Sequence, residues 1–191
     1  MHGLINRSIQ RFVVDEYGQD IWQRVVRQAD LGFANFEAMW LYEDALTGKT
    51  LRACAAVLGR PQCELMEDIG TYLVAHPNNQ VLRRLLRFGG QSFADFLLSL
   101  DELPQRARMA IAQLDIPPVD LQELTPLRYR LCCGAGIDGY APFVAGVLRA
   151  MADDYGALVL IEQGRGAWLD ITLLEARFHT PRAFVLGAKT G

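Results

Sequence analysis

The stretch LRYRLCCGAGIDGYAPFVAGVLRAMADDY, residues 127–155, places a strand pattern, a glycine-rich turn and a helix pattern one after another. Apolar residues alternate with other residues over 127–133, as they do in a strand with one buried face. Three glycines follow within 134–139. The apolar run over 141–155 has a proline near its start and is followed by Gly156, which is the usual order of helix signals. The stretch therefore predicts a strand that leads into a single crossing helix.

The residues on either side of this stretch complete the fold class. Two apolar runs, 158–162 and 168–178, flank a Gln-Gly-Arg-Gly turn and predict a hairpin. Towards the N-terminus, apolar residues recur at three- and four-residue steps, which predicts helices over 3–17, 21–31, 41–58, 65–76 and 81–88. Helices followed by a small antiparallel sheet with one crossing helix define an α+β fold.

The length of the chain sets its domain organisation. A chain of 191 residues is long enough for one domain with a proper core. We expect a single domain over 1–186, with a helical N-terminal lobe over about 1–75. An α/β lobe with the small sheet would cover about 76–186, and 187–191 would be a tail.

The segment GQSFADFLLSLDELPQRARMAIAQL, residues 90–114, predicts two further helices. Ser99 followed by Glu102 has the spacing of a capping box, in which each residue satisfies a free backbone N–H at the helix start. Pro104 would then lie in the first turn of the second helix, where a proline costs little.

Composition excludes several partners. The formal net charge is −3, and the arginines are spread along the chain, so nucleic acid is not expected as a partner. No apolar run approaches the roughly 18 residues of a membrane-spanning helix, so no membrane insertion is expected. The N-terminus has no signal-peptide pattern, which predicts a cytoplasmic location.

Neither the cysteines nor the motifs of the chain indicate an enzyme. The four cysteines, Cys54, Cys63, Cys132 and Cys133, form no C-x-x-C pair and are expected to be reduced thiols, mainly in the core. No G-x-S-x-G, phosphate loop or H-E-x-x-H is present. Neighbouring carboxylates on a helix diverge by about 100°, so the acidic pairs of the chain do not converge as acid and base. We expect a non-enzymatic protein.

Several stretches, in order along nearly the whole chain, carry a resemblance to a known family. They are MHGLINRSIQRFVVDEYG at the start, YED at 42–44, ELMEDIGTYLV at 64–74, LLSLDELP at 97–104, IPP at 116–118 and APFVAGVLRAM at 141–151. Together they resemble the heme-nitric oxide/oxygen binding (H-NOX) family of gas sensors, and the chain looks like a single-domain bacterial member. The resemblance implies a heme-binding signalling domain of α+β fold.

The resemblance also shows where this sequence departs from the family. The family motif LDxLH supplies a histidine that ligates heme iron, but here the segment ends in Pro104, which has no side-chain donor atom. The family motif Y-x-S-x-R binds the heme propionates. One register places Tyr129, Leu131 and Cys133 there, and a gapless count from Ala141 places Cys133, Ala135 and Ile137. Both registers lack the serine and the arginine, although Arg128 or Arg130 could substitute.

Other pocket positions are assigned by the same resemblance. Ile5, Ile9 and Leu73 match apolar wall positions, although they could equally be core residues. Pro118 matches the proline that presses on the heme, or else it ends a helix. A thiolate from Cys132 or Cys133 is a further candidate for the iron ligand.

The histidines offer one weak candidate for a metal ligand. His76 lies at the end of the helix that would line the distal side, and it is either a replacement ligand or a helix-end residue. His2 and His179 are expected at the chain terminus and on a strand surface.

Two functional hypotheses follow. The first is a sensor or regulatory domain whose heme is either absent or held through an unexpected ligand such as His76. Its signal would pass to a separate cyclase, kinase or diguanylate cyclase. The second is a protein-interaction scaffold, or a carrier of an apolar small molecule in the former heme pocket.

Overall fold

The α+β fold expected from the sequence is present. The computed structural model describes residues 1–111, 113–164 and 166–175. The eight α-helices formed by these residues are α1 (Gly3–Tyr17), α2 (Gln19–Gln28), α3 (Asp44–Leu58), α4 (Gln62–Ala75), α5 (Gln80–Arg87), α6 (Phe93–Leu98), α7 (Leu103–Ala110) and α8 (Tyr140–Tyr155). Short 3₁₀ turns, η1 (Pro77–Asn79) and η2 (Leu100–Glu102), precede α5 and α7.

The C-terminal part contains a four-stranded antiparallel sheet. Its strands are β1 (Val119–Thr125), β2 (Arg128–Cys133), β3 (Leu158–Gln163) and β4 (Trp168–Glu175), in the spatial order β1-β2-β4-β3. The hairpin β3–β4 was expected, and residues 176–178 of its predicted second strand lie outside the described residues. Strand β3 is an edge strand, and the guanidinium of Arg149 donates to its Ile161 carbonyl at 3.2 Å.

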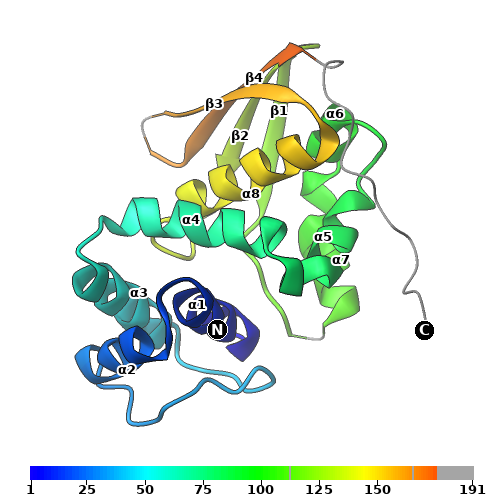
Figure 1. Cartoon of the computed structure of the whole chain (residues 1–191). Helices are drawn as coiled ribbons and strands as arrows, with labels where there is room; N and C mark the ends of the chain where they lie inside the picture. Colours follow the sequence, from blue (N-terminus) through cyan, green and yellow to red (C-terminus); the bar gives the residue numbers. More distant parts are fainter. Residues whose placement is uncertain (112, 165, 176–191) are drawn as a thin grey trace, which may run out of the picture.

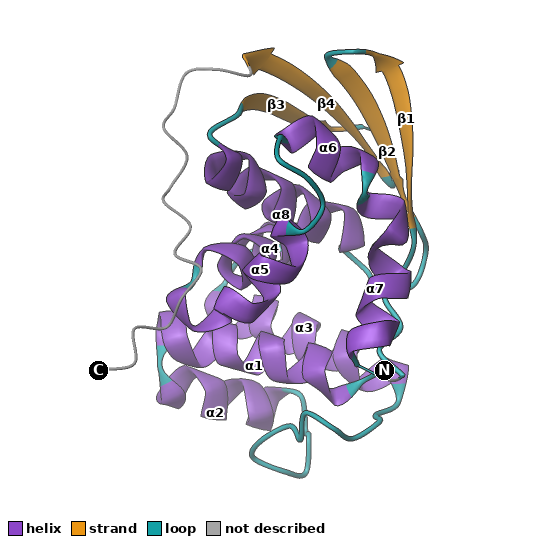
Figure 2. Ribbon diagram, turned by 90° about the vertical axis from the view of Figure 1, so that its right-hand side faces the viewer, coloured by secondary structure: helices purple, strands orange, loops and turns teal. Residues whose placement is uncertain are grey.

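The layers follow one another from the sheet to the N-terminal helices. Helix α8 covers one face of the sheet, α4 lies against α8, and α1, α2 and α3 form a group on the other side of α4 (Figure 1). Helices α5, α6 and α7 stand at one side of this stack, as the rotated view also shows (Figure 2).

Two apolar cores lie on the two sides of the α4–α8 pair. One is centred on α1 to α4 and contains fully buried Trp22, Phe36 and Leu65. The other lies between α8, α6 and the sheet and contains Leu148 and Leu169. Helix α4 contributes to both cores, and so joins the helical lobe to the sheet.

The α4–α8 contact is made by main chain. Gly70 of α4 faces the Phe143 carbonyl of α8, and Gly146 of α8 faces the Glu67 carbonyl of α4, with no room for a Cβ at either position. The hydroxyl of Thr71 donates across the same seam to the Gly146 carbonyl at 3.4 Å. The two glycines thus allow the helices to approach more closely than side chains would permit.

Three sequence expectations are corrected by the structure. Strand β1 was not predicted, because two prolines precede it and most of its side chains are exposed at the sheet edge, which weakens the alternation. The third helix begins at Asp44 rather than Leu41. The capping box is formed by Ser92 and Asp95, whereas the Ser99 hydroxyl donates to the Phe96 carbonyl. Pro104 does lie in the first turn of its helix, as expected.

A buried ion pair fastens α5 to α8. Asp154 is 4% exposed and pairs with the guanidinium groups of Arg83 and Arg87, the latter with Nε 3.9 Å from Oδ2. The Arg87 guanidinium also lies 3.8 Å above the centre of the Tyr155 ring, whose hydroxyl donates to the Gly90 carbonyl. These charged contacts add to the apolar contact of α5 with the core, which Leu86, 4% exposed, and Leu82 provide.

Replacing Asp154 with alanine is expected to lower the free energy of unfolding by about 2 kcal/mol, because two arginines lose the carboxylate that compensates their burial. The arginines are about a fifth to a quarter exposed, which keeps the loss below that of a fully buried pair. The matched control is Asp153→Ala, one residue earlier on the exposed side of α8. Urea unfolding followed by circular dichroism measures both. Equal midpoints for the two variants would contradict a stabilising role for the pair.

Candidate functional site

Pro104 is the residue that the resemblance places where the family motif has its histidine. It lies in the first turn of α7, half-buried, and Ala107, one turn later on the same side of the helix, is 5% exposed. The helix that would present an iron ligand is therefore present, and its inward side reaches a sheltered environment. The ring of Pro104 has only carbon atoms beyond the backbone, so it offers nothing to coordinate a metal.

The three candidate wall residues lie on α1 and α4. Ile9 is buried in the core of the helical lobe, and Leu73 packs against the same core. Ile5 is half-buried and lies one helical turn before Ile9, on the same side of α1. The structure thus brings Ile9 and Leu73 together, and both also serve as ordinary core residues.

Pro118 and Tyr129 lie elsewhere. Pro118 is exposed just before β1, and its carbonyl accepts from the Gly134 amide at 2.8 Å. Tyr129 is buried in the other core, beneath the sheet, and its hydroxyl donates to the Pro126 carbonyl at 3.1 Å. The five candidate pocket residues therefore do not gather in one place.

The gapless register of the second motif falls on a cavity. Cys133, Ala135 and Ile137 all line a hollow of about 420 Å³, together with Cys63, Gly134, Gly136, Asp138, Gly139, Tyr140, Ala141, Pro142, Gln163, Gly166 and Ala167. Ile137 also contacts both apolar cores. The glycine-rich run between strand and helix was expected only as a turn, and this cavity was not anticipated from it.

Of the two thiols that line this hollow, that of Cys133 is kept protonated. Burial, and to a smaller extent the neighbouring Cys132, raises the pKa of Cys133 to about 12. A thiolate at Cys133 would therefore be a very small fraction near neutral pH, and thiol is a poor iron ligand. Among the other cysteines, Cys54 is buried and Cys63 is exposed. Cys63 therefore lies outside the core, although the reduced thiols were expected mainly inside it.

His76 is used locally. It ends α4 and begins η1, its Nδ1 accepts from the Asn78 amide at 3.4 Å, and its ring packs against the Tyr72 ring at a 35° tilt, with centroids 4.7 Å apart. These contacts are those of a helix-end histidine. His2, expected as a terminal residue, is instead 4% exposed and accepts from the Leu4 amide as the N-cap of α1. His179 lies outside the described residues.

The nearby arginines face away from the helices. Arg128 and Arg130 alternate along β2 with buried Tyr129 and Leu131, so both side chains lie on the outer face of the sheet. There the Arg130 Nε donates to the Asp170 carboxylate at 2.7 Å. Neither arginine lies on the side where a propionate clamp would be needed.

Taken together, the residues at the family positions do not fit heme. By the resemblance, Pro104 stands at the iron-ligand position, both registers of the clamp motif lack the serine and the arginine, and the side chains of Arg128 and Arg130 face outwards. Among the residues that the structure describes, no group of three or more histidine, cysteine or carboxylate side chains could hold a metal ion.

No helix within the described ranges is long and apolar enough to cross a membrane.

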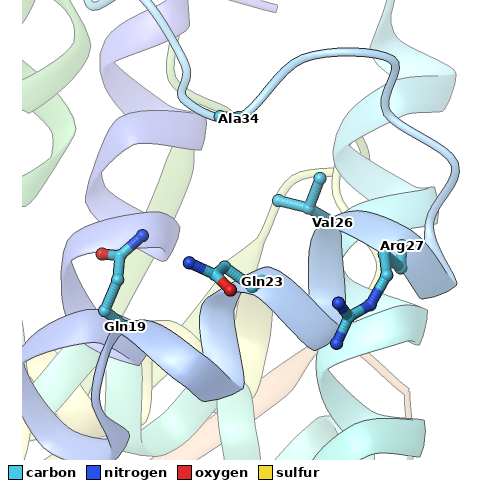
Figure 3. Close-up of a pocket in the computed structure, with 5 residues that line it drawn as sticks. All are labelled: Gln19, Gln23, Val26, Arg27 and Ala34. Carbon is cyan, nitrogen blue, oxygen red and sulfur yellow. The ribbon is translucent and has the colours of Figure 1, made fainter.

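A second hollow, of about 240 Å³, lies on the surface between α2 and the loop that follows it. Gln19 and Gln23 lie along α2, near Val26 and Arg27, and Ala34 lies on the loop (Figure 3). Most of these side chains are exposed, so the hollow is a surface depression without the apolar enclosure of a cofactor site.

Comparison with solved structures defines the class of protein by its fold. The chain superposes on an Fe(II) unliganded H-NOX protein from K. algicida with a TM-score of 0.77, covering 94% of this chain and 100% of that one at 14% identity. An H-NOX protein from S. oneidensis in the Fe(II)NO ligation state gives a TM-score of 0.76 at 15% identity. The match covers 92% of this chain and 100% of that one. The fold is thus that of the H-NOX sensor domains.

Sequence comparison gives the family. The haem-NO-binding (HNOB) family profile matches residues 2–163, so the chain belongs to the haem-NO-binding family. Soluble guanylate cyclase 89Da of Drosophila melanogaster is 25% identical over 158 residues, which are 83% of this chain and 24% of that protein. Soluble guanylate cyclase gcy-31 of Caenorhabditis elegans is 26% identical over 154 residues, which are 81% of this chain and 22% of that protein. The chain spans about a quarter of the length of these relatives.

Proposed function

We propose that this chain is a non-enzymatic regulatory domain of the haem-NO-binding family that works without heme. The observation that supports this most directly is Pro104 at the iron-ligand position, on a helix that is otherwise in place. The altered clamp adds to it, because loss of both directional contacts leaves only apolar burial to hold a porphyrin.

The proposal places the output in another protein. The family fold and the guanylate cyclase relatives support a role in signalling, and a separate cyclase, kinase or diguanylate cyclase is the expected recipient. Within the domain, α4 and α8 would carry a change in one lobe to the other, because α4 contributes side chains to both cores.

A carrier function is the second candidate. The hollow of about 420 Å³ beside the glycine-rich run has the volume of a small-molecule site, although it is open to the surface and many of its lining residues, among them Ala135 and Asp138, are exposed. Its lining is dominated by small and apolar residues, which would suit an uncharged organic ligand. Retention of a small molecule by the purified protein, detected by native mass spectrometry, would favour this function over a scaffold.

The visible absorption spectrum tests the heme-free proposal. After expression with ample heme supply, the folded protein is expected to have no Soret band, with or without reductant and nitric oxide. Circular dichroism provides the control for folding. A strong Soret band that shifts with nitric oxide would contradict the proposal, and a His76→Ala variant would then ask whether His76 is the replacement ligand.

A further inference from the structure

Three consecutive large apolar residues are exposed in the loop between α2 and α3. Met39, Trp40 and Leu41 are 76%, 65% and 60% exposed, and we call them the apolar triplet. The loop lies on the far side of the helical lobe from the sheet (Figure 1). Single exposed apolar residues are common, but three adjacent ones that include a tryptophan are typical of an interaction site.

The loop beneath the apolar triplet is packed by aromatic rings. Phe36 is fully buried and lies 5.1 Å from both Phe33 and Tyr42 and 6.2 Å from Trp22, measured between ring centroids. The Trp22 indole N–H donates to the Ala34 carbonyl at 2.8 Å. The loop therefore has its own small core and does not depend on a partner for its shape.

Backbone hydrogen bonds fix the apolar triplet against the start of α1. The Gly3 amide donates to the Trp40 carbonyl at 2.7 Å, the Tyr42 amide donates to the Met1 carbonyl at 2.9 Å, and His2 forms an isolated antiparallel bridge with Leu41. Gly3 leaves no room for a Cβ against the Glu37 carbonyl. Because the backbone is already ordered, docking through these side chains would cost less conformational entropy than docking through a free loop.

The surroundings of the apolar triplet are acidic. Residues 31–48 contain Glu37, Glu43 and Asp44 but no lysine or arginine, and all three carboxylates are exposed. The amino group of Met1 pairs with Asp44, whose side chain nevertheless remains 82% exposed. Arg7 contacts the loop through a hydrogen bond from its guanidinium to the Phe36 carbonyl, and Arg27 lines a hollow together with Ala34 of the loop.

We propose that the apolar triplet docks into an apolar groove, rimmed by lysine or arginine, on a partner protein. Charge decides between the possible occupants. An anionic membrane would be repelled by the carboxylates, and a second copy of this chain would place like charges opposite each other. An apolar groove would accept the side chains of the apolar triplet, and a basic rim would pair with the carboxylates around it. The inference rests on the proposed regulatory role for its biological meaning, but it can be tested without reference to heme.

The test uses a synthetic probe of the proposed chemistry. Fluorescence anisotropy would measure binding of the whole chain to a labelled amphipathic helix of leucine and lysine, with a leucine–glutamate helix as the opposite-charge control. The leucine–lysine helix is expected to bind at least about ten-fold more tightly than its control, and this preference should weaken in about 0.5 M salt.

Variants assign the binding to the apolar triplet. Replacing Met39, Trp40 and Leu41 together with serine is expected to weaken binding at least about ten-fold. Glu43→Lys is expected to weaken it several-fold, about three-fold or more. The matched control replaces Phe88 and Met109 with serine, since these side chains are more exposed but isolated. That control should bind like the original chain, and circular dichroism confirms that each variant folds.

Four results would overturn the inference. They are failure of the leucine–lysine helix to bind, binding that survives loss of the apolar triplet, a dimer in sedimentation velocity that the serine variant abolishes, and triplet-dependent binding to phosphatidylserine-containing vesicles. The last two would assign the apolar triplet to self-association or to a membrane. None of them affects the heme-free proposal, which the Soret spectrum tests separately.

Discussion

Replacing Gly70 with alanine is expected to lower the free energy of unfolding by at least about 3 kcal/mol. The added Cβ would fall well inside contact distance of the Phe143 carbonyl, which belongs to the backbone of α8 and cannot rotate away. Helix α4 would have to move away from α8, and both apolar cores would lose packing because α4 contributes to each. Gly146→Ala is expected to act in the same direction, through the Glu67 carbonyl.

The chain offers a matched control for this substitution. Gly48 lies within α3, where an added Cβ would meet only the end of the flexible Arg52 side chain, at 3.2 Å. Gly48→Ala is expected to be neutral or to stabilise by about 0.5–1 kcal/mol, because alanine favours the helix and restricts the unfolded chain. Urea unfolding followed by circular dichroism compares the two. A Gly70→Ala variant as stable as Gly48→Ala would show that the α4–α8 seam tolerates a side chain.

Replacing Pro104 with histidine is expected to raise heme retention by about 100-fold or more over the original chain, which would appear as a new Soret band. The physical reason is that the substitution returns an imidazole nitrogen to the first turn of α7, on the same side of the helix as buried Ala107. Heme is supplied during expression, unbound heme is removed by desalting, and the Soret absorbance per mole of protein is then measured. Loss of the proline ring is expected to change the free energy of unfolding little. Position 104 lies in the first turn of α7, which starts at Leu103, and the first turn of a helix tolerates most residue types.

Gln105→His is the control, since it adds the same imidazole one residue later, on an exposed part of the helix. Only the Pro104→His variant should acquire the band. If both variants remain colourless while folded, the former heme pocket is filled by side chains, and the scaffold function becomes the better proposal. If both acquire the band, heme is binding to the surface.

Most of the fold could be predicted because it depends on local signals. Glycines and prolines mark the ends of α1, α3, α4 and α8, and each of these helices has apolar residues on the side or sides that it buries. Strand β1 was missed because it is an edge strand whose register comes from pairing with β2, which no local pattern encodes. The position of the capping box was wrong because two serines, Ser92 and Ser99, both have an acidic residue three positions later.

The site was less predictable, because its geometry depends on long-range packing. The sequence alone shows that Pro104 has no side-chain donor atom, whereas its place at the iron-ligand position is inferred from the resemblance. The sequence could not choose between the two registers of the second motif. In the structure, Tyr129 lies beneath the sheet, whereas Cys133, which belongs to both registers, lines a hollow together with Ala135 and Ile137. The exposed apolar triplet was also missed, and Leu41 was instead taken as the first residue of the helix predicted over 41–58.

The glycine contact between α4 and α8 bears on how far sequences with this fold can diverge. Where two helices meet through their main chains, the crossing requires only that the two contact positions stay small, and it places no demand on the size or polarity of the residues around them. Such a joint can persist while the rest of the chain changes. This is consistent with a TM-score of 0.77 at only 14% identity.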